Sequence, residues 1–142
     1  MLRWTMAILL SLFALGAAAC GGDESGGNSP STSVAIASDE FSDVTGESEV
    51  DVSVVDNEFV DPYITVSPGT KVTWIHEGRN PHNILSLIKN TFRADVDDFG
   101  VGDTYTYEFD KPGDYPYYCS VHGTAKLNGQ AGVVRVAAAS GK

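Results

Sequence analysis

The fold of this chain is decided by residues 112–122, which read PGDYPYYCSVH. Pro112 and Gly113 form a turn, and the aromatic run after them favours a strand that reaches Cys119. His122 follows that cysteine by three residues. A thiol and an imidazole this close together are a candidate pair of metal ligands. The spacing alone fits equally well a buried structural cysteine beside a surface histidine.

Short strand patterns lie on both sides of this stretch. Alternation of apolar and polar residues, bounded by Pro-Gly turns at residues 67–70 and 111–114, predicts strands over residues 50–55, 63–66, 71–76, 82–87, 104–109, 115–119 and 132–137. Nothing in residues 50–138 has the pattern of a long amphipathic helix, and residues 92–99 have room for a single helical turn. Short strands at this spacing predict an all-β sandwich.

The first 19 residues have the pattern of a secretory signal peptide. Arg3 supplies the positive charge, and residues 6–15 form an apolar run that is too short to span a membrane. The segment ends in Ala-Ala-Ala-Cys, which resembles a lipoprotein signal, and this resemblance implies that Cys20 is lipidated. The alternative is ordinary cleavage just before an unmodified Cys20. Both predict export, and the anchor places the chain at the outer face of a bacterial cell membrane or in the periplasm.

Residues 20–48 are rich in Gly, Ser, Thr and acidic residues, a composition that buries too little apolar surface to fold alone. We expect a flexible acidic linker here, followed by one domain over residues 49–142. A loosely attached strand at residues 33–37 is the alternative, because residues 34–37 interrupt the polar run.

The chain is strongly acidic, with a formal net charge of −10. Between Gly21 and Thr70 there are eleven Asp and Glu residues and no Lys or Arg. Nucleic-acid binding is disfavoured, because no basic face is available for phosphates. The acidic residues either steer the protein towards a basic partner or form an ordinary solvated surface.

The cysteine and histidine counts limit the metal chemistry. With Cys20 lipidated, Cys119 is a lone thiol in an oxidising compartment, which points to a metal, a reactive role or a partner chain. The histidines are His76, His82 and His122. A four-cysteine zinc site is impossible with two cysteines, and the Cys-x-x-Cys-His motif of covalent haem is missing.

Three segments together resemble the plastocyanin and pseudoazurin family, the cupredoxins. Residues 112–122 match the pattern Pro-Gly-x-Tyr-x-aromatic-x-Cys-x-x-His, and residues 80–84 (NPHNI) are similar to the family's Pro-His-Asn-Val loop. Residues 56–74 are similar to the opening strands of bacterial members. The segments occur in the family's order across residues 50–136, and the resemblance implies a Greek-key β-sandwich of about seven to eight strands.

The resemblance implies that His82, Cys119 and His122 are the three strong ligands of one type 1 copper ion, which cycles between Cu(I) and Cu(II). It also implies that Asn83 and Ser120, the neighbours of two ligands, bond to each other and tie the ligand loops together. Tyr115 resembles a tyrosine-corner residue with a structural role.

The axial ligand departs from the family pattern. Counting five residues from His122 reaches Leu127, which cannot coordinate, and no Met occurs after Met6. The family ending Gly-Met-x-Gly is similar to residues 129–132, so Gln130 occupies the Met position. A carboxamide oxygen there predicts a lower reduction potential than a Met-ligated relative has. The alternative is a surface Gln130 and a three-coordinate site.

The implied function is one-electron transfer by a monomer that docks transiently with redox proteins, without catalytic turnover. His122 is the expected electron port, in an apolar patch with Pro81, Ala125 and Leu127. Copper storage or delivery to a cuproenzyme is one alternative. Another is a nucleophilic enzyme in which His82 or His122 activates Cys119, although the sequence has no evident oxyanion motif. His76 is either a residue that supports the site or a hydrogen-bonded structural histidine.

Overall fold

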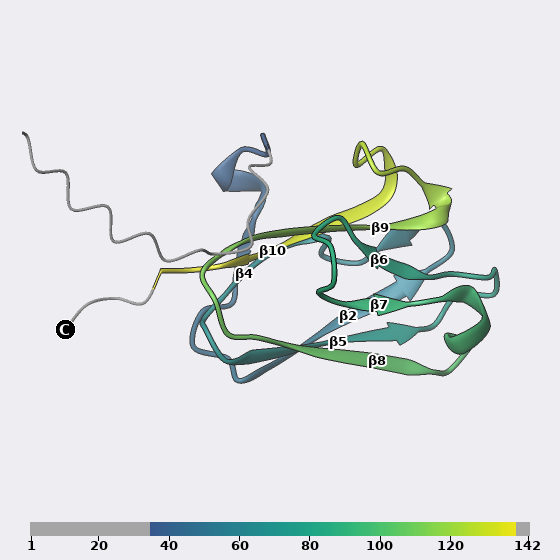
Figure 1. Cartoon of the computed structure of the whole chain (residues 1–142), viewed down its shortest axis with the longest axis horizontal. Helices are drawn as coiled ribbons and strands as arrows, with labels where there is room; N and C mark the ends of the chain where they lie inside the picture. The colour runs from purple at the N-terminus through teal and green to yellow at the C-terminus, as the bar shows by residue number, and fades with distance from the viewer. Residues whose placement is uncertain (1–34, 139–142) are drawn as a thin grey trace, which may run out of the picture.

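The computed structural model describes residues 35–138, so the predicted signal peptide and Cys20 lie outside the described residues. The described chain folds into two β-sheets packed face to face, with β9 and β10 in one layer and β5 and β8 in the other (Figure 1). The prediction of an all-β sandwich is confirmed. None of the helices in residues 35–138 is long and apolar enough to cross a membrane.

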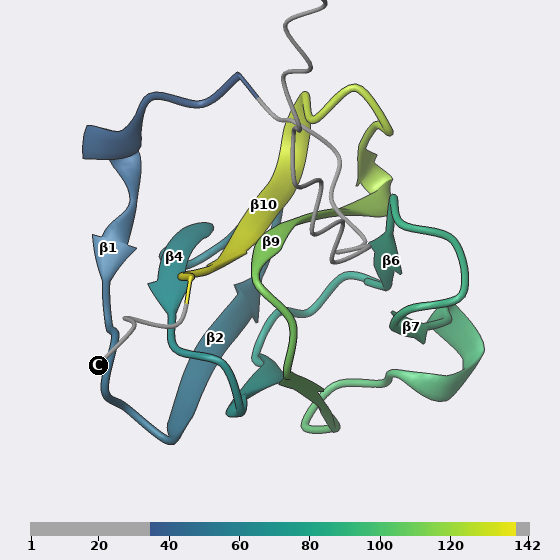
Figure 2. The same cartoon turned by 60° about the vertical axis from the view of Figure 1, so that its left-hand side comes forward.

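The larger sheet has six strands in the order β1–β4–β10–β9–β6–β7. Their bounds are β1 (Ser42–Asp43), β4 (Tyr63–Val66), β10 (Gly129–Val136), β9 (Gly113–Gly123), β6 (Ile84–Ser86) and β7 (Arg93–Ala94). Figure 2 shows β10 between β4 and β9. Strand β10 runs parallel to β4 and antiparallel to β9.

The smaller sheet has the order β3–β2–β5–β8. Its strands are β3 (Glu58–Phe59), β2 (Glu49–Val55), β5 (Thr70–His76) and β8 (Thr104–Phe109), and two short 3-10 helices are η1 (Ser38–Glu40) and η2 (Val96–Asp98). Parallel pairing of β2 with β5 brings their C-terminal ends to one end of the sandwich, at the right in Figure 1, where β9 also ends.

The residues described form ten strands, against the seven to eight expected. The surplus is explained by β1, β3 and β7, which have two residues each. Periodicity needs about four residues to be visible, so strands this short leave no sequence pattern.

The core between the sheets is aromatic. Trp74 is fully buried on β5, where it stacks on Phe92 at 5.3 Å between ring centroids and meets the edge of Tyr117 at 5.2 Å. Each such aromatic pair contributes about 0.5–1.5 kcal/mol beyond its buried area. Tyr115 donates a hydrogen bond from its hydroxyl to the carbonyl of Lys111 at 2.8 Å, the contact of a tyrosine corner. This core makes a rigid support for the loops at its end.

The segment predicted as a flexible linker contributes to the sandwich. Within residues 20–48, β1 pairs in parallel with β4, and the Val44 N–H donates to the carbonyl of Thr65 at 2.9 Å. The guanidinium of Arg135 lies 3.9 Å from the ring centroid of Phe41. These backbone and cation–π contacts attach residues 41–44 to the domain, and composition alone does not reveal them.

Candidate metal centre

Three side chains of types that commonly bind metals meet at the end of the sandwich. Nδ1 of His82 and Nδ1 of His122 each lie 3.8 Å from Sγ of Cys119. Among the described residues, these three make the one group of three or more His, Cys, Asp or Glu that could hold a metal ion, with ligand atoms within 4.8 Å of one another. Cys119 and His82 are fully buried and His122 is partly exposed.

An irregularity in β9 brings these groups together. The pairing of β9 with β10 shifts register between Tyr118–Ala131 and Gly123–Gly129, so residues 119–122 face Gln130 alone. A bulge of this kind bends the strand and re-aims its side chains. Cys119, His122 and Gln130 therefore share one site although they belong to two strands, and His82 reaches it from the loop between β5 and β6.

Glycine is required where the bulge closes. A Cβ atom on Gly123 would collide with the backbone carbonyl of Gln130, and one on Gly129 would collide with the carbonyl of His122. Gly129 also has a φ of 76°, in the left-handed region. Both glycines let the backbones of β9 and β10 approach closely next to His122 and Gln130.

Gln130 is buried and its carboxamide has one orientation that satisfies its hydrogen bonds. Its Nε2 donates to the carbonyls of Val55, at 3.2 Å, and Glu58, at 2.9 Å. Its Oε1 therefore faces Nδ1 of His82, 2.9 Å away. Leu127 lies instead in a turn in which its N–H donates to the carbonyl of Thr124.

Asn83 and Ser120 join the two ligand segments. Nδ2 of Asn83 donates to the hydroxyl of Ser120 at 2.9 Å, and the Ser120 N–H donates to Oδ1 of Asn83 at 2.8 Å. This reciprocal pair fixes His82, next to Asn83, relative to Cys119, next to Ser120.

The environment of His82 favours the neutral form that binds metals. Burial lowers the pKa of its imidazole, and the hydrogen bond with Gln130 opposes that shift only in part. A neutral imidazole and a thiolate are ligands that suit copper, and a carboxamide oxygen completes a donor set with a weak axial member. The residues present therefore fit a copper ion.

His76 packs against His82 and contacts the loop that carries it. The ring is buried, with Nδ1 3.1 Å from the carbonyl of Phe99 and Nε2 3.0 Å from that of Asn80. It also meets the His82 ring edge-on at 5.0 Å between centroids. His76 thus connects β5 to the loop that carries His82.

Asp56 also lies near His82, and the sequence gives no sign of this contact. Nε2 of His82 lies 3.7 Å from Oδ1 of Asp56, in the turn between β2 and β3. Asp56 is one acid in a long acidic stretch, and no local pattern marks it as different from the others.

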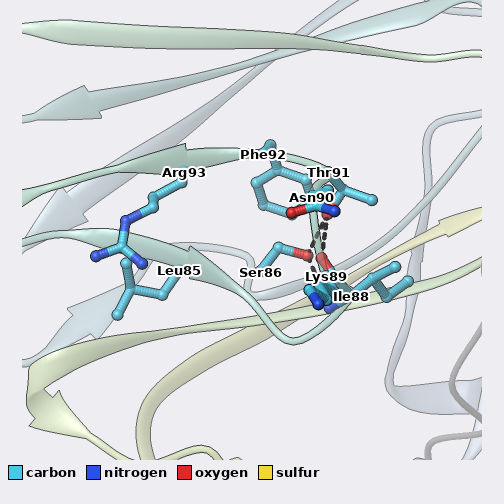
Figure 3. Close-up of a pocket in the computed structure, with 8 residues that line it drawn as sticks. All are labelled: Leu85, Ser86, Ile88, Lys89, Asn90, Thr91, Phe92 and Arg93. Atoms are coloured by element: carbon cyan, nitrogen blue, oxygen red, sulfur yellow. Dashed lines mark hydrogen bonds between the residues drawn. The ribbon is translucent and has the colours of Figure 1, made fainter.

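A separate pocket of about 290 Å³ lies beside the β6–β7 connection, and none of the three candidate ligands lines it (Figure 3). Residues 85, 86 and 88–93 line it, and the Thr91 hydroxyl donates to Oγ of Ser86 at 2.7 Å. No His, Cys, Asp or Glu lines this pocket, so it offers no alternative metal site.

Comparison with known proteins supports copper as the metal. The family model described as copper binding proteins, plastocyanin/azurin family, matches residues 46–134. A chloroplastic plastocyanin of Tetradesmus obliquus is 33% identical over 75 residues, which are 47% of this chain and 52% of the relative. Amicyanin-alpha of Methylorubrum extorquens is 28% identical over 74 residues, 51% of this chain and 62% of the relative. The chain spans about half the length of the chloroplastic plastocyanins that it matches.

Solved structures show the same fold. A purple cupredoxin from Nitrosopumilus maritimus superposes with a TM-score of 0.53 and 24% identity, over 62% of this chain and 99% of that chain. A copper-containing nitrite reductase from Thermus scotoductus superposes with a TM-score of 0.56 and 21% identity, over 72% of this chain and 29% of that one. With the family model covering more than half of its length, the chain belongs to the plastocyanin/azurin family of copper-binding proteins.

Proposed function

We propose that this protein is a one-electron carrier with a type 1 copper site. His82, Cys119 and His122 are the strong ligands, and Oε1 of Gln130 is the weak axial ligand. The observation that carries this proposal is the convergence of two imidazole nitrogens and a thiol, with the Gln130 oxygen 2.9 Å from one of those nitrogens. Bound copper supplies the exchange of one electron between Cu(I) and Cu(II).

The chain's contribution is a site that keeps its shape. The Asn83–Ser120 pair fixes the two ligand segments, and the carbonyls of Val55 and Glu58 fix the Gln130 amide. Ligands held in this way move little when the charge at the site changes, so the barrier to electron transfer stays low. Cys119 binds as a thiolate, because metal coordination deprotonates a thiol.

His122 is the proposed electron port. It is the one ligand of the three that is partly exposed, and its neighbour Val121 is 47% exposed. Pro81 and Ala125 are also exposed apolar residues of the adjoining loops. An apolar surface around the exposed ligand suits brief docking of a redox protein, whereas the buried ligands are out of its reach.

We further propose that the mature chain acts outside the cytoplasm as a monomer, anchored through lipidated Cys20, and has no catalytic turnover. The export signal in residues 1–19 supports the location. The complete burial of His82 and Cys119, which keeps these two ligands out of contact with solvent, supports the proposed lack of turnover.

Electron exchange and copper transfer distinguish an electron carrier from a copper-delivery module. For residues 21–142 loaded with copper, NMR line broadening in mixtures of the two oxidation states measures electron self-exchange, and a Cu(I) chelator measures copper release. We expect fast exchange and copper that stays bound over the same period. Slow exchange with ready transfer of copper to the chelator would establish delivery instead.

A further inference from the structure

The turn between β2 and β3, residues 55–58, contacts both sides of the metal centre. Its carbonyls at Val55 and Glu58 accept hydrogen bonds from Gln130, as described above. Asp56, between them, points to the other side, towards the loop that carries His82. One short turn therefore positions the proposed axial ligand and contacts the first histidine ligand.

The carboxylate of Asp56 is firmly held. Its Oδ1 accepts the backbone N–H of Arg79 at 2.6 Å and that of Asn80 at 3.0 Å. These hydrogen bonds, first from Asn80 and then from Arg79, hold the pKa of Asp56 below its usual value. Asp56 is thus a fixed negative charge at the start of the His82 loop.

Nε2 of His82 has no hydrogen-bond partner although the ring is fully buried. A buried ring nitrogen without a partner is unusual and needs an explanation. The nearest charged group is Oδ1 of Asp56 at 3.7 Å, slightly beyond hydrogen-bond distance.

Gly78 keeps the space between these two atoms open. A Cβ atom at this position would lie 2.7 Å from Oδ1 of Asp56 and 2.9 Å from Nε2 of His82. Any larger residue would push the carboxylate and the imidazole apart. The glycine is therefore needed for the close approach of the two groups.

We propose that Asp56 is the outer-sphere partner of His82 and lowers the reduction potential of the site. This inference rests on the proposed copper function. When Nδ1 of His82 binds a metal, the proton of the neutral ring is on Nε2 and points into the space beside Asp56. The negative charge of the carboxylate attracts this proton and so makes the imidazole a stronger electron donor, which favours Cu(II) over Cu(I). Asp56 acts on the metal centre through His82 and does not bind the metal itself.

The test is Asp56→Asn with Asp51→Asn as its matched control. Asparagine keeps an Oδ1 that accepts from Arg79 and Asn80 but removes the charge beside His82. Asp51→Asn removes the same charge from an exposed site on β2. Loss of an outer-sphere partner lowers metal affinity about 10-fold or more. A 10-fold loss of Cu(II) affinity at unchanged Cu(I) affinity raises the potential by about 59 mV.

Two measurements report this change: the reduction potential of the copper form, and the ¹⁵N chemical shift of His82 Nε2 in the Zn(II)-substituted protein. In Asp56→Asn we expect the reduction potential to rise and the ¹⁵N chemical shift to change. In Asp51→Asn we expect both quantities to stay at their wild-type values. Equal values in wild type and both variants would overturn the role of Asp56. If Asp56→Asn does not fold, Asp56→Ser replaces it, because a hydroxyl oxygen can also accept from a backbone N–H but carries no charge: a higher potential supports the proposal, and an unchanged one overturns it.

Failure of this inference differs from failure of the proposed function. If the wild-type protein has the spectrum of type 1 copper but Asp56→Asn leaves the potential unaltered, only the role of Asp56 is wrong. If the wild-type protein lacks that spectrum, the electron-carrier proposal itself is wrong.

Discussion

The side-chain oxygen of Gln130 lies 2.9 Å from Nδ1 of His82, and the amide nitrogen of Gln130 is fully used by two backbone carbonyls. The carboxamide oxygen has no proton to donate. The contact therefore needs either a proton on Nδ1 or a metal ion that accepts a lone pair from each of the two atoms. The backbone of the β2–β3 turn thereby fixes which end of the carboxamide faces the site.

Gln130→Met tests this relationship. A thioether is a softer donor than a carboxamide oxygen, so it favours Cu(I), and we expect the potential to rise by more than about 59 mV, a tenfold change in relative affinity. Protein-film voltammetry measures it. The carbonyls of Val55 and Glu58 also lose their donor, which lowers the free energy of unfolding by about 1–3 kcal/mol. An unchanged potential would show that Gln130 does not coordinate.

Asn83→Ala removes both hydrogen bonds between the ligand segments, whereas Ser120→Ala removes one, because its backbone N–H remains. We expect the free energy of unfolding to fall by about 1–3 kcal/mol in Asn83→Ala and by less in Ser120→Ala. Urea unfolding of the metal-free protein measures both. Equal losses in the two variants would contradict the contribution assigned to the Ser120 N–H bond.

Gly129→Ala combines a backbone penalty with a collision, and Gly102→Ala isolates the backbone penalty. Gly102 has a φ of 89° and open space around its Cβ position. We expect Gly102→Ala to lower stability by about 1–2 kcal/mol. Gly129→Ala should lower it further and weaken copper binding, because the new methyl group displaces the backbone of His122. Thermal unfolding and Cu(II) titration compare them, and equal behaviour of the two variants would rule out the required close approach.

Two truncations test where the domain begins. Removal of residues 21–37 leaves β1 in place, and removal of residues 21–48 deletes β1 together with Phe41 and Val44. We expect the longer deletion alone to lower the free energy of unfolding, by more than about 1 kcal/mol, since Val44 packs against the core. Chemical denaturation provides the measurement. Equal stability of the two truncated forms would show that residues 38–48 act as a linker.

The sequence predicts the sandwich and the candidate ligands for different reasons. The strands around Trp74 and Tyr117 are long enough to show alternation, and the positions of His82, Cys119 and His122 follow from resemblance to a family. The bulge that places Gln130 opposite residues 119–122 depends on a shift in register between two strands, which no local pattern encodes. The contacts of Asp56 are also invisible in sequence, because they join residues 23 or more positions apart through backbone N–H groups, which every residue type except proline possesses.

The proposed electron transfer requires that His82, Cys119 and His122 form one type 1 copper site. The most direct test adds Cu(II) to residues 21–142 and records absorption and EPR spectra, with Cys119→Ser as the control. We predict an intense thiolate-to-copper band in the visible region, a narrow copper hyperfine splitting, and loss of both in Cys119→Ser. A pale protein with the spectrum of ordinary tetragonal copper, or a visible band that survives in Cys119→Ser, would contradict the assignment.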